Sequence, residues 1–342
     1  MIKRRDFVKQ LAITGMGTTL VGDPVSQWML KSSGNQKEIK LGVIGLAVHS
    51  AAFSTFLNDK DKLPDLAGCH IEALYHPPGN PDVEFTPKQL AEFKSTVEIA
   101  GVKIVSSVDE LLSMVDGVLI ETNDGRPHME QILPVLKARK PVFLDKPVAE
   151  DLSGVIKIYR AAAEYNVPIF SSSSLRYGSR PQGINKSKKN QVLGANTYSP
   201  ASLEPGHTDL YWYGIHGVEM LYTVMGIGCQ EVWQIGRSKA GDVVGGVWEN
   251  DRVGIFRGIR EGKRDYGGTV FMNDEIVELG TFEGYRPLVV KIVEFFTTGQ
   301  SPVSKDETLE IYAFMTAANI SKLKGGKRVS VTELKKEFGI IS

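Results

Sequence analysis

The chain has 342 residues, of which 42% are hydrophobic and 23% charged, as is ordinary for a globular protein of about two domains. Forty basic residues balance forty acidic ones without any block of like charge, so nothing indicates nucleic acid as a partner. The two cysteines, Cys69 and Cys229, fit neither a disulfide framework nor a metal cluster, and no run reaches the roughly 18 apolar residues of a membrane span.

The first thirty residues differ from the rest of the chain. A short basic start contains the pair Arg4-Arg5, followed by Phe7 and Lys9, and then by a mildly apolar stretch over 11–22. This order of regions is typical of an export signal, and it resembles the R-R-x-F-x-K pattern that the Tat machinery reads. We therefore expect residues 1–36 to be a Tat-type signal and linker, with a periplasmic protein that stays tethered to the membrane if the signal is not cleaved. The alternative is a disordered basic terminus.

Between residues 38 and 171, short apolar segments alternate with helical patterns. We predict strands at 38–44, 70–75, 102–105, 117–121, 141–144 and 167–171, and helices at 50–57, 88–100, 108–114, 129–138 and 152–165. Such alternation produces βαβ units, a parallel sheet and right-handed crossovers. We assign residues 37–175 to an α/β dinucleotide-binding domain of the Rossmann type.

The pattern changes after Arg176. We predict strands at 196–199, 231–236, 242–248, 252–257 and 267–272, with helices at 214–225, 285–298 and 306–323. Short turns such as 249–251 join several strands, which indicates antiparallel pairing. We assign residues 176–342 to an α+β domain for substrate binding and oligomerisation, with helices on one face of its sheet.

The turn after the first strand partly matches the dinucleotide pattern G-x-G-x-x-G. Its three positions are Gly45, Ala47 and Ser50, so one glycine remains and two small residues replace the others. A pyrophosphate can still lie on the helix N-terminus, although a turn without a ligand fits this segment equally well. The second strand ends at Tyr75-His76 without the acid that holds an adenosine ribose, which leaves NAD and NADP both open.

Polar residues follow two later strands, where parallel sheets bind their ligands. The first set is Thr122, Asn123 and His128, and the second is Asp145-Lys146. We expect the two sets to lie close together at one edge of the sheet.

The order of these segments resembles the glucose–fructose oxidoreductase / inositol dehydrogenase / MocA (Gfo/Idh/MocA) family over about residues 38–330. Four segments carry the resemblance: T-x-x-x-x-x-H at 122–128, D-K-P-x-A at 145–149, the strand end Leu175-Arg176-Tyr177, and G-x-H-x-x-E-x-L at 214–221. The resemblance implies a Rossmann domain followed by an α+β domain with an open, mostly antiparallel sheet, NAD or NADP as cofactor, and a homo-oligomer formed through the exposed face of that sheet.

The resemblance also implies roles for single residues. Lys146 would touch both the nicotinamide and a substrate hydroxyl, and His216 would be the acid/base, since imidazole titrates near neutral pH. Trp212 stands where the family has an aspartate, so we name Asp209 as the third candidate catalytic residue. The expected cofactor-binding residues are Gly45, Leu46, Ala47, His49, Ser50, Thr122, Asn123, His128, Asp145, Lys146 and Arg176.

A metal reading of the helix start is the alternative. His216 and Glu219 are three residues apart on a helix, and His207 and Asp209 lie just upstream. Because such two-residue spacings are common by chance, we assign no metal site. Tyr211, Trp212 and Tyr213 are candidates for an aromatic floor under a sugar ring, or for partly buried core residues.

These observations favour an NAD(P)-dependent oxidoreductase that acts on a secondary CH–OH group of a sugar, cyclitol or glycoside. An exported enzyme exchanges cofactor poorly with the cytoplasm, so the nucleotide is expected to be tightly bound and recycled. The alternatives are a nucleotide-binding relative without turnover, and an NAD-dependent glycoside-cleaving enzyme.

Overall fold

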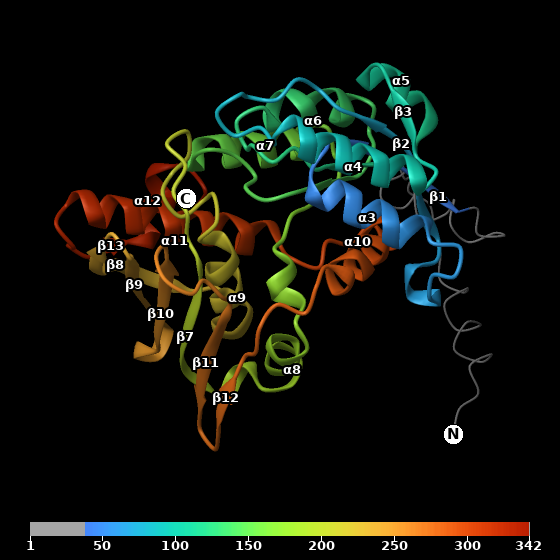
Figure 1. Cartoon of the computed structure of the whole chain (residues 1–342). Helices are drawn as coiled ribbons and strands as arrows, with labels where there is room; N and C mark the ends of the chain where they lie inside the picture. Colours follow the sequence, from blue (N-terminus) through green and yellow to red (C-terminus); the bar gives the residue numbers. More distant parts are fainter. Residues whose placement is uncertain (1–37, 342) are drawn as a thin grey trace, which may run out of the picture. The chain divides into compact units, whose positions relative to one another are not determined.

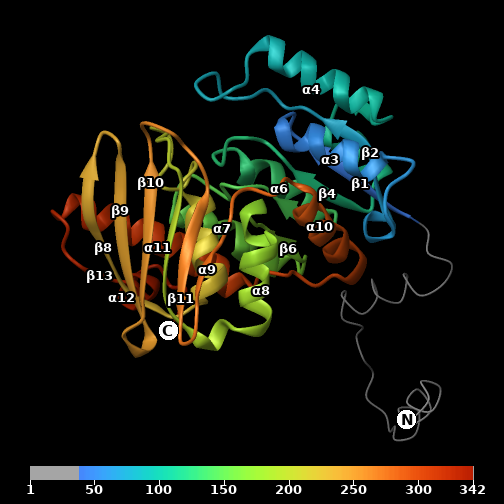
Figure 2. The ribbon, with the colours of Figure 1, turned by 60° about the horizontal axis from the view of Figure 1, so that its bottom comes forward.

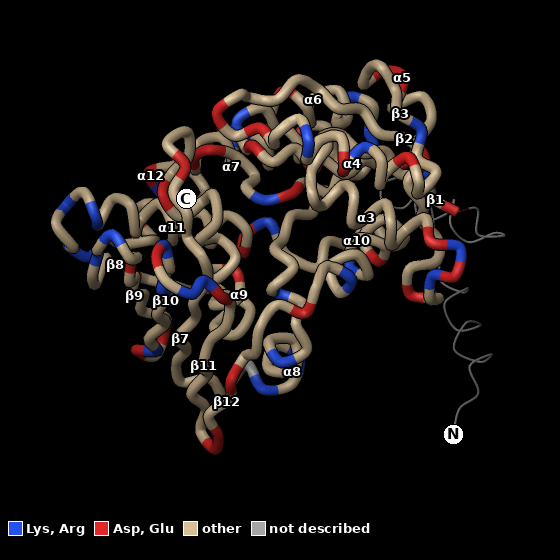
Figure 3. Tube along the Cα trace, viewed as in Figure 1, with Lys and Arg blue, Asp and Glu red and all other residues tan. Residues whose placement is uncertain are grey.

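The computed structural model describes residues 38–341, so the expected signal with Arg4-Arg5 lies outside the described residues. Among the helices of the described part, none combines the length and the apolar character needed to cross a bilayer. Acidic and basic positions are interspersed along the trace (Figure 3).

A six-stranded parallel sheet forms the first layer of the fold (Figure 1). Its strands are β1 Ile39–Ile44, β2 Cys69–Tyr75, β3 Lys103–Val105, β4 Gly117–Ile120, β5 Val142–Leu144 and β6 Ile169–Phe170. The spatial order β3-β2-β1-β4-β5-β6 is that of a Rossmann fold, as predicted. The strand order reverses between β1 and β4, which is where such folds bind their ligands.

Helices cover both faces of this sheet, and alternating strand residues decide which face each one meets. On one face Ile120 and Leu144 pack with the helices α5 Val108–Met114, α6 His128–Lys137 and α7 Leu152–Glu164. On the other face Leu119 and Phe143 pack with α3 Val48–Asn58, α4 Pro87–Ile99 and α10 Arg286–Thr298. The helix α10 comes from the C-terminal part of the chain, so a segment distant in sequence completes the cover of the first layer.

The second sheet has seven strands and is mostly antiparallel (Figure 2). Its strands are β7 Val192–Pro200, β8 Cys229–Ser238, β9 Gly241–Trp248, β10 Val253–Ile259, β11 Gly267–Met272, β12 Ile276–Glu278 and β13 Val329–Ser330. The pair β7–β10 is parallel, and the other pairs are antiparallel. The helices α9 Ile215–Met225 and α11 Lys305–Leu323 pack on one face of it.

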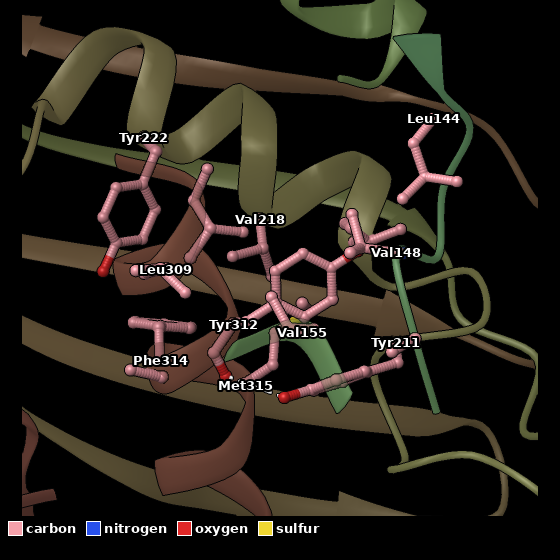
Figure 4. Packing of buried hydrophobic residues seen from close by; sticks show 14 of the residues in the cluster. Leu144, Val148, Val155, Tyr211, Val218, Tyr222, Leu309, Tyr312, Phe314 and Met315 are labelled. Atoms are coloured by element: carbon pink, nitrogen blue, oxygen red, sulfur yellow. Dashed lines mark hydrogen bonds between the residues drawn. The ribbon is translucent and has the colours of Figure 1, made fainter. Parts of the chain in front are cut away.

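The core between the two layers fixes the segment that follows β5 (Figure 4). Val148 donates its backbone N–H to the hydroxyl of Tyr312 on α11 at 2.7 Å, inside a cluster that contains Val155 and Val218. The backbone two residues beyond Lys146 is therefore anchored to the second domain.

Each strand and helix predicted above has a counterpart in the structure, and both cysteines are buried and free. Apart from short 3₁₀ turns, the elements of residues 38–341 that were not predicted are the helices α8 Ser179–Ser187 and α12 Val331–Glu337, and the short strands β12 and β13. These are short or polar segments, in which hydrophobic periodicity is weak.

Candidate functional site

Two hollows lie on either side of the N-terminus of α3. The first, here called the turn hollow, comprises about 310 Å³, including space open to solvent, and is lined by Gly45, Leu46, His76, Pro77, Gly79, Asn80, Val83, Glu84, Thr122, Asn123 and Asp124. The second, here called the inner cavity, comprises about 340 Å³, likewise including space open to solvent, and is lined by His49, Lys146, Ser174, Leu175, Tyr213, His216, Tyr266, Phe282 and Tyr285. Because Leu46 and His49 are three residues apart, an elongated ligand that passes the start of α3 would reach both.

The turn between β1 and α3 depends on one glycine. Gly45 has φ of 101°, a region that L side chains rarely adopt, and a Cβ there would overlap the backbone nitrogen of Thr122. The Ser50 hydroxyl accepts the Ala47 N–H at 2.7 Å and donates to the Ala47 carbonyl at 2.8 Å, which closes the turn locally. The amides at the start of α3 have no acceptor within the helix, as at any helix N-terminus. The turn thus brings β1 and β4 together and leaves a positive helix end beside the hollow.

The side chains of the turn hollow are mainly acidic or neutral. Glu84, from the loop after β2, and Asp124, after β4, both line it, and no lysine or arginine among residues 38–341 does so. Burial opposes ionisation of Asp124, but hydrogen bonds from His207, Arg126 and Asn80 outweigh it and hold its pKa below the usual range. The hydroxyl of Thr122 is buried without a partner among the described residues, so the hollow presents an unused hydrogen-bonding group.

Lys146 and His216 meet in the inner cavity, although 70 residues separate them in the chain. The Lys146 ammonium lies 5.9 Å from the ring centroid of Tyr213. His216 Nδ1 bonds to the hydroxyl of Ser173 at 2.7 Å, which leaves Nε2 as the nitrogen for the cavity. Burial lowers the pKa of His216 well below its usual range, and the Lys146 charge acts in the same direction. The imidazole is therefore neutral at pH 7, as a general base must be.

Aromatic side chains form a continuous wall around the cavity. Successive ring centroids along the series Tyr213–His216–Tyr266–Phe282–Tyr285–His49 lie 5.1, 6.0, 6.1, 5.1 and 4.7 Å apart. Ring faces and edges of this kind suit the C–H surface of a compact polar ligand, while the hydroxyls of the tyrosines offer hydrogen bonds. Of the three adjacent aromatics proposed as a floor, Tyr213 lines the cavity.

The other two have structural partners. Tyr211 is fully buried and bonds to Thr316 at 2.8 Å, and Trp212 packs on His207 at 5.0 Å between ring centroids.

A carboxylate pair lies beneath His49. Its Nδ1 is 2.7 Å from Asp145 Oδ2 and 3.8 Å from Glu121 Oε2. Phe53 stacks on the His49 ring with 5.4 Å between the ring centroids. The imidazole is therefore held by Phe53 at its face and by Asp145 at Nδ1. Burial, and next the charge of Asp145, raises the pKa of Glu121 well above its usual value.

Two predicted cofactor contacts lie inside the protein framework. Arg176 is buried and pairs with Glu219 at 2.8 Å and with Glu307 at 2.6 Å, which ties the segment after β6 to α9 and α11. His128 is fully buried and joins the carbonyls of Thr122 and Val148, at 3.0 and 3.1 Å. Both residues hold the loops that carry the lining residues, and neither lines a hollow itself.

Asp209 and His207, upstream of α9, do not line the inner cavity. Asp209 forms an ion pair with Lys322 of α11, and His207 Nε2 lies 3.2 Å from Asp124 Oδ1. Since Glu219 pairs with Arg176 and His216 bonds to Ser173, each of the four residues of the metal alternative has a protein partner within residues 38–341.

The turn hollow can accept a dinucleotide. Gly45 provides the close backbone approach, the helix N-terminus suits a pyrophosphate, and the unused Thr122 hydroxyl and the Asn123 amide suit sugar or base groups. From there a nicotinamide would reach Lys146 in the inner cavity. It would supply or accept a hydride there.

Sequence reasoning missed several lining residues. Tyr266, Phe282 and Tyr285 come from the segments around β11 and α10, and no local pattern marks them. Glu121, which lies beneath His49 and lines neither hollow, had a weak sign in the sequence, because it is an acid directly after the apolar residues 118–120. Glu84 follows a long loop after β2, beyond the position where an acid was sought.

Comparison with known proteins agrees with this geometry. Residues 39–172 match the model of the Gfo/Idh/MocA oxidoreductase family with an NAD-binding Rossmann fold. Comparison with curated protein sequences gave no significant match.

Solved structures share the fold at low sequence identity. A putative NADPH-dependent oxidoreductase from Desulfitobacterium hafniense has a TM-score of 0.70 at 15% identity, covering 87% of this chain and 99% of that one. Myo-inositol 2-dehydrogenase from Lactobacillus plantarum has a TM-score of 0.69 at 16% identity, and the match covers 86% of this chain and 99% of that one. A third structure is an oxidoreductase from Agrobacterium radiobacter in complex with NAD⁺, L-tartaric acid and magnesium. It has a TM-score of 0.66 at 15% identity, and the match covers 87% of this chain and 100% of that one.

The family match covers the part of the chain that forms the parallel sheet and the turn hollow, and the solved structures extend the fold to the second sheet. Residues 39–172 therefore form an NAD(P)-binding Rossmann domain, and it is similar to that of the Gfo/Idh/MocA oxidoreductases.

Proposed function

We propose that the protein is an NAD(P)-dependent oxidoreductase that moves a hydride between the nicotinamide and a secondary hydroxyl of a sugar, cyclitol or glycoside. The observation that carries the proposal is the convergence of Lys146 and His216 in one aromatic cavity next to the dinucleotide turn. The family match of the first domain and the dehydrogenases among the structural neighbours support the reaction class.

Each of the two polar side chains has a task that its surroundings support. His216 is neutral and held through Nδ1 by Ser173, so Nε2 is placed to take the hydroxyl proton as the hydride leaves. Lys146, on a backbone anchored through Val148, would orient that hydroxyl and stabilise negative charge on its oxygen. The aromatic wall would hold the ring of the substrate and exclude water.

The experiment starts from the nucleotide. Mass spectrometry of material released from denatured protein identifies any bound NAD or NADP, and calorimetric titration of the emptied protein measures its binding. A panel of cyclitols, sugars and glycosides is then screened by cofactor absorbance and by product release, because a redox-neutral cycle leaves no net change in the cofactor. Absence of binding by every oxidised and reduced nicotinamide nucleotide would refute the proposal, whereas binding without any turnover would favour a binding protein.

We further propose export through the Tat pathway to the periplasm. The support is the sequence around Arg4-Arg5, in residues outside the described part of the chain. Replacing both arginines with lysine keeps the charge, and it is expected to retain the protein in the cytoplasm of the native host. A doubly substituted protein that still reaches the periplasm would contradict this.

We also propose a homo-oligomer formed through the outer face of the second sheet. Register places Tyr198, Val253 and Phe271 on the face opposite α9 and α11, and all three side chains are exposed. Phe271→Glu is expected to reduce the mass measured by light scattering after size exclusion, while Ile99→Glu, at an exposed site on α4, leaves it unchanged. A wild-type protein that elutes as a monomer would rule this interface out.

A further inference from the structure

His49, Glu121 and Asp145 form a cluster that the proposed hydride chemistry does not use. One ligand atom from each residue, a ring nitrogen of His49 and one carboxylate oxygen of each acid, lies within 4.8 Å of the other two. The cluster lies where β4 and β5 end, and His49 connects it to the inner cavity. Strand alternation explains the placement, because Glu121 follows Leu119 toward the α3 face of the sheet.

The two carboxylates lack the partners that buried charges require. Glu121 is fully buried, and neither of its oxygens has a hydrogen-bond partner among the described residues; Asp145 has one oxygen in the same condition. Buried polar groups are almost always hydrogen-bonded, and an unpaired buried carboxylate is strongly unfavourable. Lys146 and His49 are the positive or protonatable groups that act on the pair: His49 and the backbone N–H of Lys146 bond to Asp145, and among the described residues the Lys146 ammonium bonds to neither carboxylate.

We propose that His49, Glu121 and Asp145 bind a divalent transition-metal ion, such as Zn²⁺ or Mn²⁺, in the wall of the inner cavity. Two carboxylates neutralise the charge of the ion, and one imidazole with two oxygens suits such an ion better than Ca²⁺, which takes six to eight oxygens. Three protein ligands leave a further position open, as in metal sites that act on a substrate. The ion would polarise an oxygen bound in the cavity, beside Lys146 and His216.

The geometry also predicts how binding depends on protons. In the metal-free cluster Nδ1 of His49 lies at hydrogen-bond distance from Asp145, and a metal ligand must give up the proton between them. Binding is therefore expected to release at least part of a proton. This distinguishes the site from surface carboxylates, which bind ions without releasing protons at pH 7.

The test uses the full chain without a histidine tag, stripped with a chelator. Calorimetric titration with ZnCl₂ and with MnCl₂ is expected to give one site per chain, with an enthalpy that depends on the ionisation enthalpy of the buffer. Glu121→Gln and His49→Gln should each weaken binding at least about a hundredfold. Glu310→Gln is the matched control, because Glu310 is equally buried but accepts hydrogen bonds from Gly228 and Cys229.

Thermal unfolding of each variant without metal guards against simple misfolding. Glu121→Gln and His49→Gln should melt cooperatively, Glu121→Gln at or above the wild-type temperature because it removes an unpaired buried carboxylate, and both should lose the stabilisation that added Zn²⁺ gives. If the wild type binds neither ion, the proposal is wrong. Binding that survives in both variants would also overturn it. Because the titration needs neither nucleotide nor substrate, its outcome is independent of the proposed oxidoreductase activity.

Discussion

The two hollows at the start of α3 are built by different means. Backbone shapes the turn hollow, through a left-handed glycine and a helix N-terminus. Side chains shape the inner cavity, where Ser173 orients His216 and Asp145 orients His49. A backbone site tolerates changes of side chain, which explains how a turn with one glycine of the usual three keeps its shape. A cavity of oriented side chains tolerates few changes.

The largest effect is expected in the inner cavity. His216→Ala should lower turnover about 10²–10⁴-fold while leaving nucleotide binding nearly unchanged, because acid–base groups act on the reaction and not on the cofactor. Lys146→Ala should have a comparable effect. Lys146→Arg should not restore activity, since the planar guanidinium of arginine cannot replace the compact ammonium of lysine. Steady-state kinetics with the substrate found in the screen, together with calorimetry of nucleotide binding, measures both.

The control for this pair is His70→Ala, at a histidine on β2 that pairs with Glu38 and Glu72 outside both hollows. It should keep full turnover. Undiminished activity in both His216→Ala and Lys146→Ala would show that the reaction takes place elsewhere.

A second substitution tests the turn hollow. Gly45→Ala should weaken nucleotide binding at least about tenfold, because the left-handed conformation alone costs about 1–2 kcal/mol and the new Cβ overlaps Thr122. Gly101→Ala is the matched control: its φ is 80°, but no atom lies within 4 Å of an added Cβ. Both variants should lose stability, and only Gly45→Ala should lose binding in fluorescence titration with NADH. Equal losses of binding would mean that the turn does not contact the nucleotide.

The side chains of the turn hollow are expected to have a smaller effect, on the preference between NADH and NADPH. Glu84 and Asp124 line it, and no lysine or arginine of the described part of the chain does, so a 2′-phosphate would meet negative charge and a ribose diol would meet hydrogen-bond acceptors. We expect NADH to bind at least about tenfold more tightly than NADPH, a difference of about 1.4 kcal/mol. Glu84→Gln should narrow the ratio, and Glu92→Gln, at an exposed site of α4, should not. Preference for NADPH in the wild type would contradict this prediction.

Several of these residues could be predicted from the chain alone. Gly45, Thr122 and Lys146 all follow apolar strands, and parallel strands end at a common edge, so pattern and topology suffice to bring them together. Asp209 was chosen for its nearness in sequence to His216, but its partner is Lys322, more than a hundred residues away. Such pairs depend on how α11 packs, which no local pattern encodes.

The same reason hid Tyr266, Phe282 and Tyr285. Phe282 and Tyr285 lie on the segment that leads into α10, and Tyr266 directly precedes β11. Neither periodicity nor spacing predicts where these elements return. The parallel pairing of β7 with β10 was equally out of reach, since short connections indicate antiparallel neighbours.

The smallest effect concerns pH. Burial lowers the pKa of His216, whereas the unfolded chain titrates near 6.5. The folded state therefore binds fewer protons than the unfolded state below about pH 6.5, so stability is complete above that pH and decreases as the pH falls toward the folded pKa. His216→Gln removes this group, and its free energy of unfolding should fall less steeply, by up to about 1.4 kcal/mol per pH unit.

Urea unfolding of both proteins between pH 7 and pH 5 measures the difference. The comparison with the variant is needed because Glu121, with its raised pKa, acts in the opposite direction over the same range. Identical pH slopes would show that His216 is solvated in the folded protein.

The return of α10 has a consequence for synthesis on the ribosome. All six strands of the first sheet have been made by residue 170, but one of its faces still lacks the apolar side chains Leu288, Ile292 and Phe296. Part of that face stays exposed to solvent until residues 286–298 have left the exit tunnel. The first sheet, although it is synthesised first, is therefore among the last parts of the protein to complete its packing. A stalled or shortened chain would expose an apolar sheet face, which makes such nascent products natural targets for chaperones and proteases.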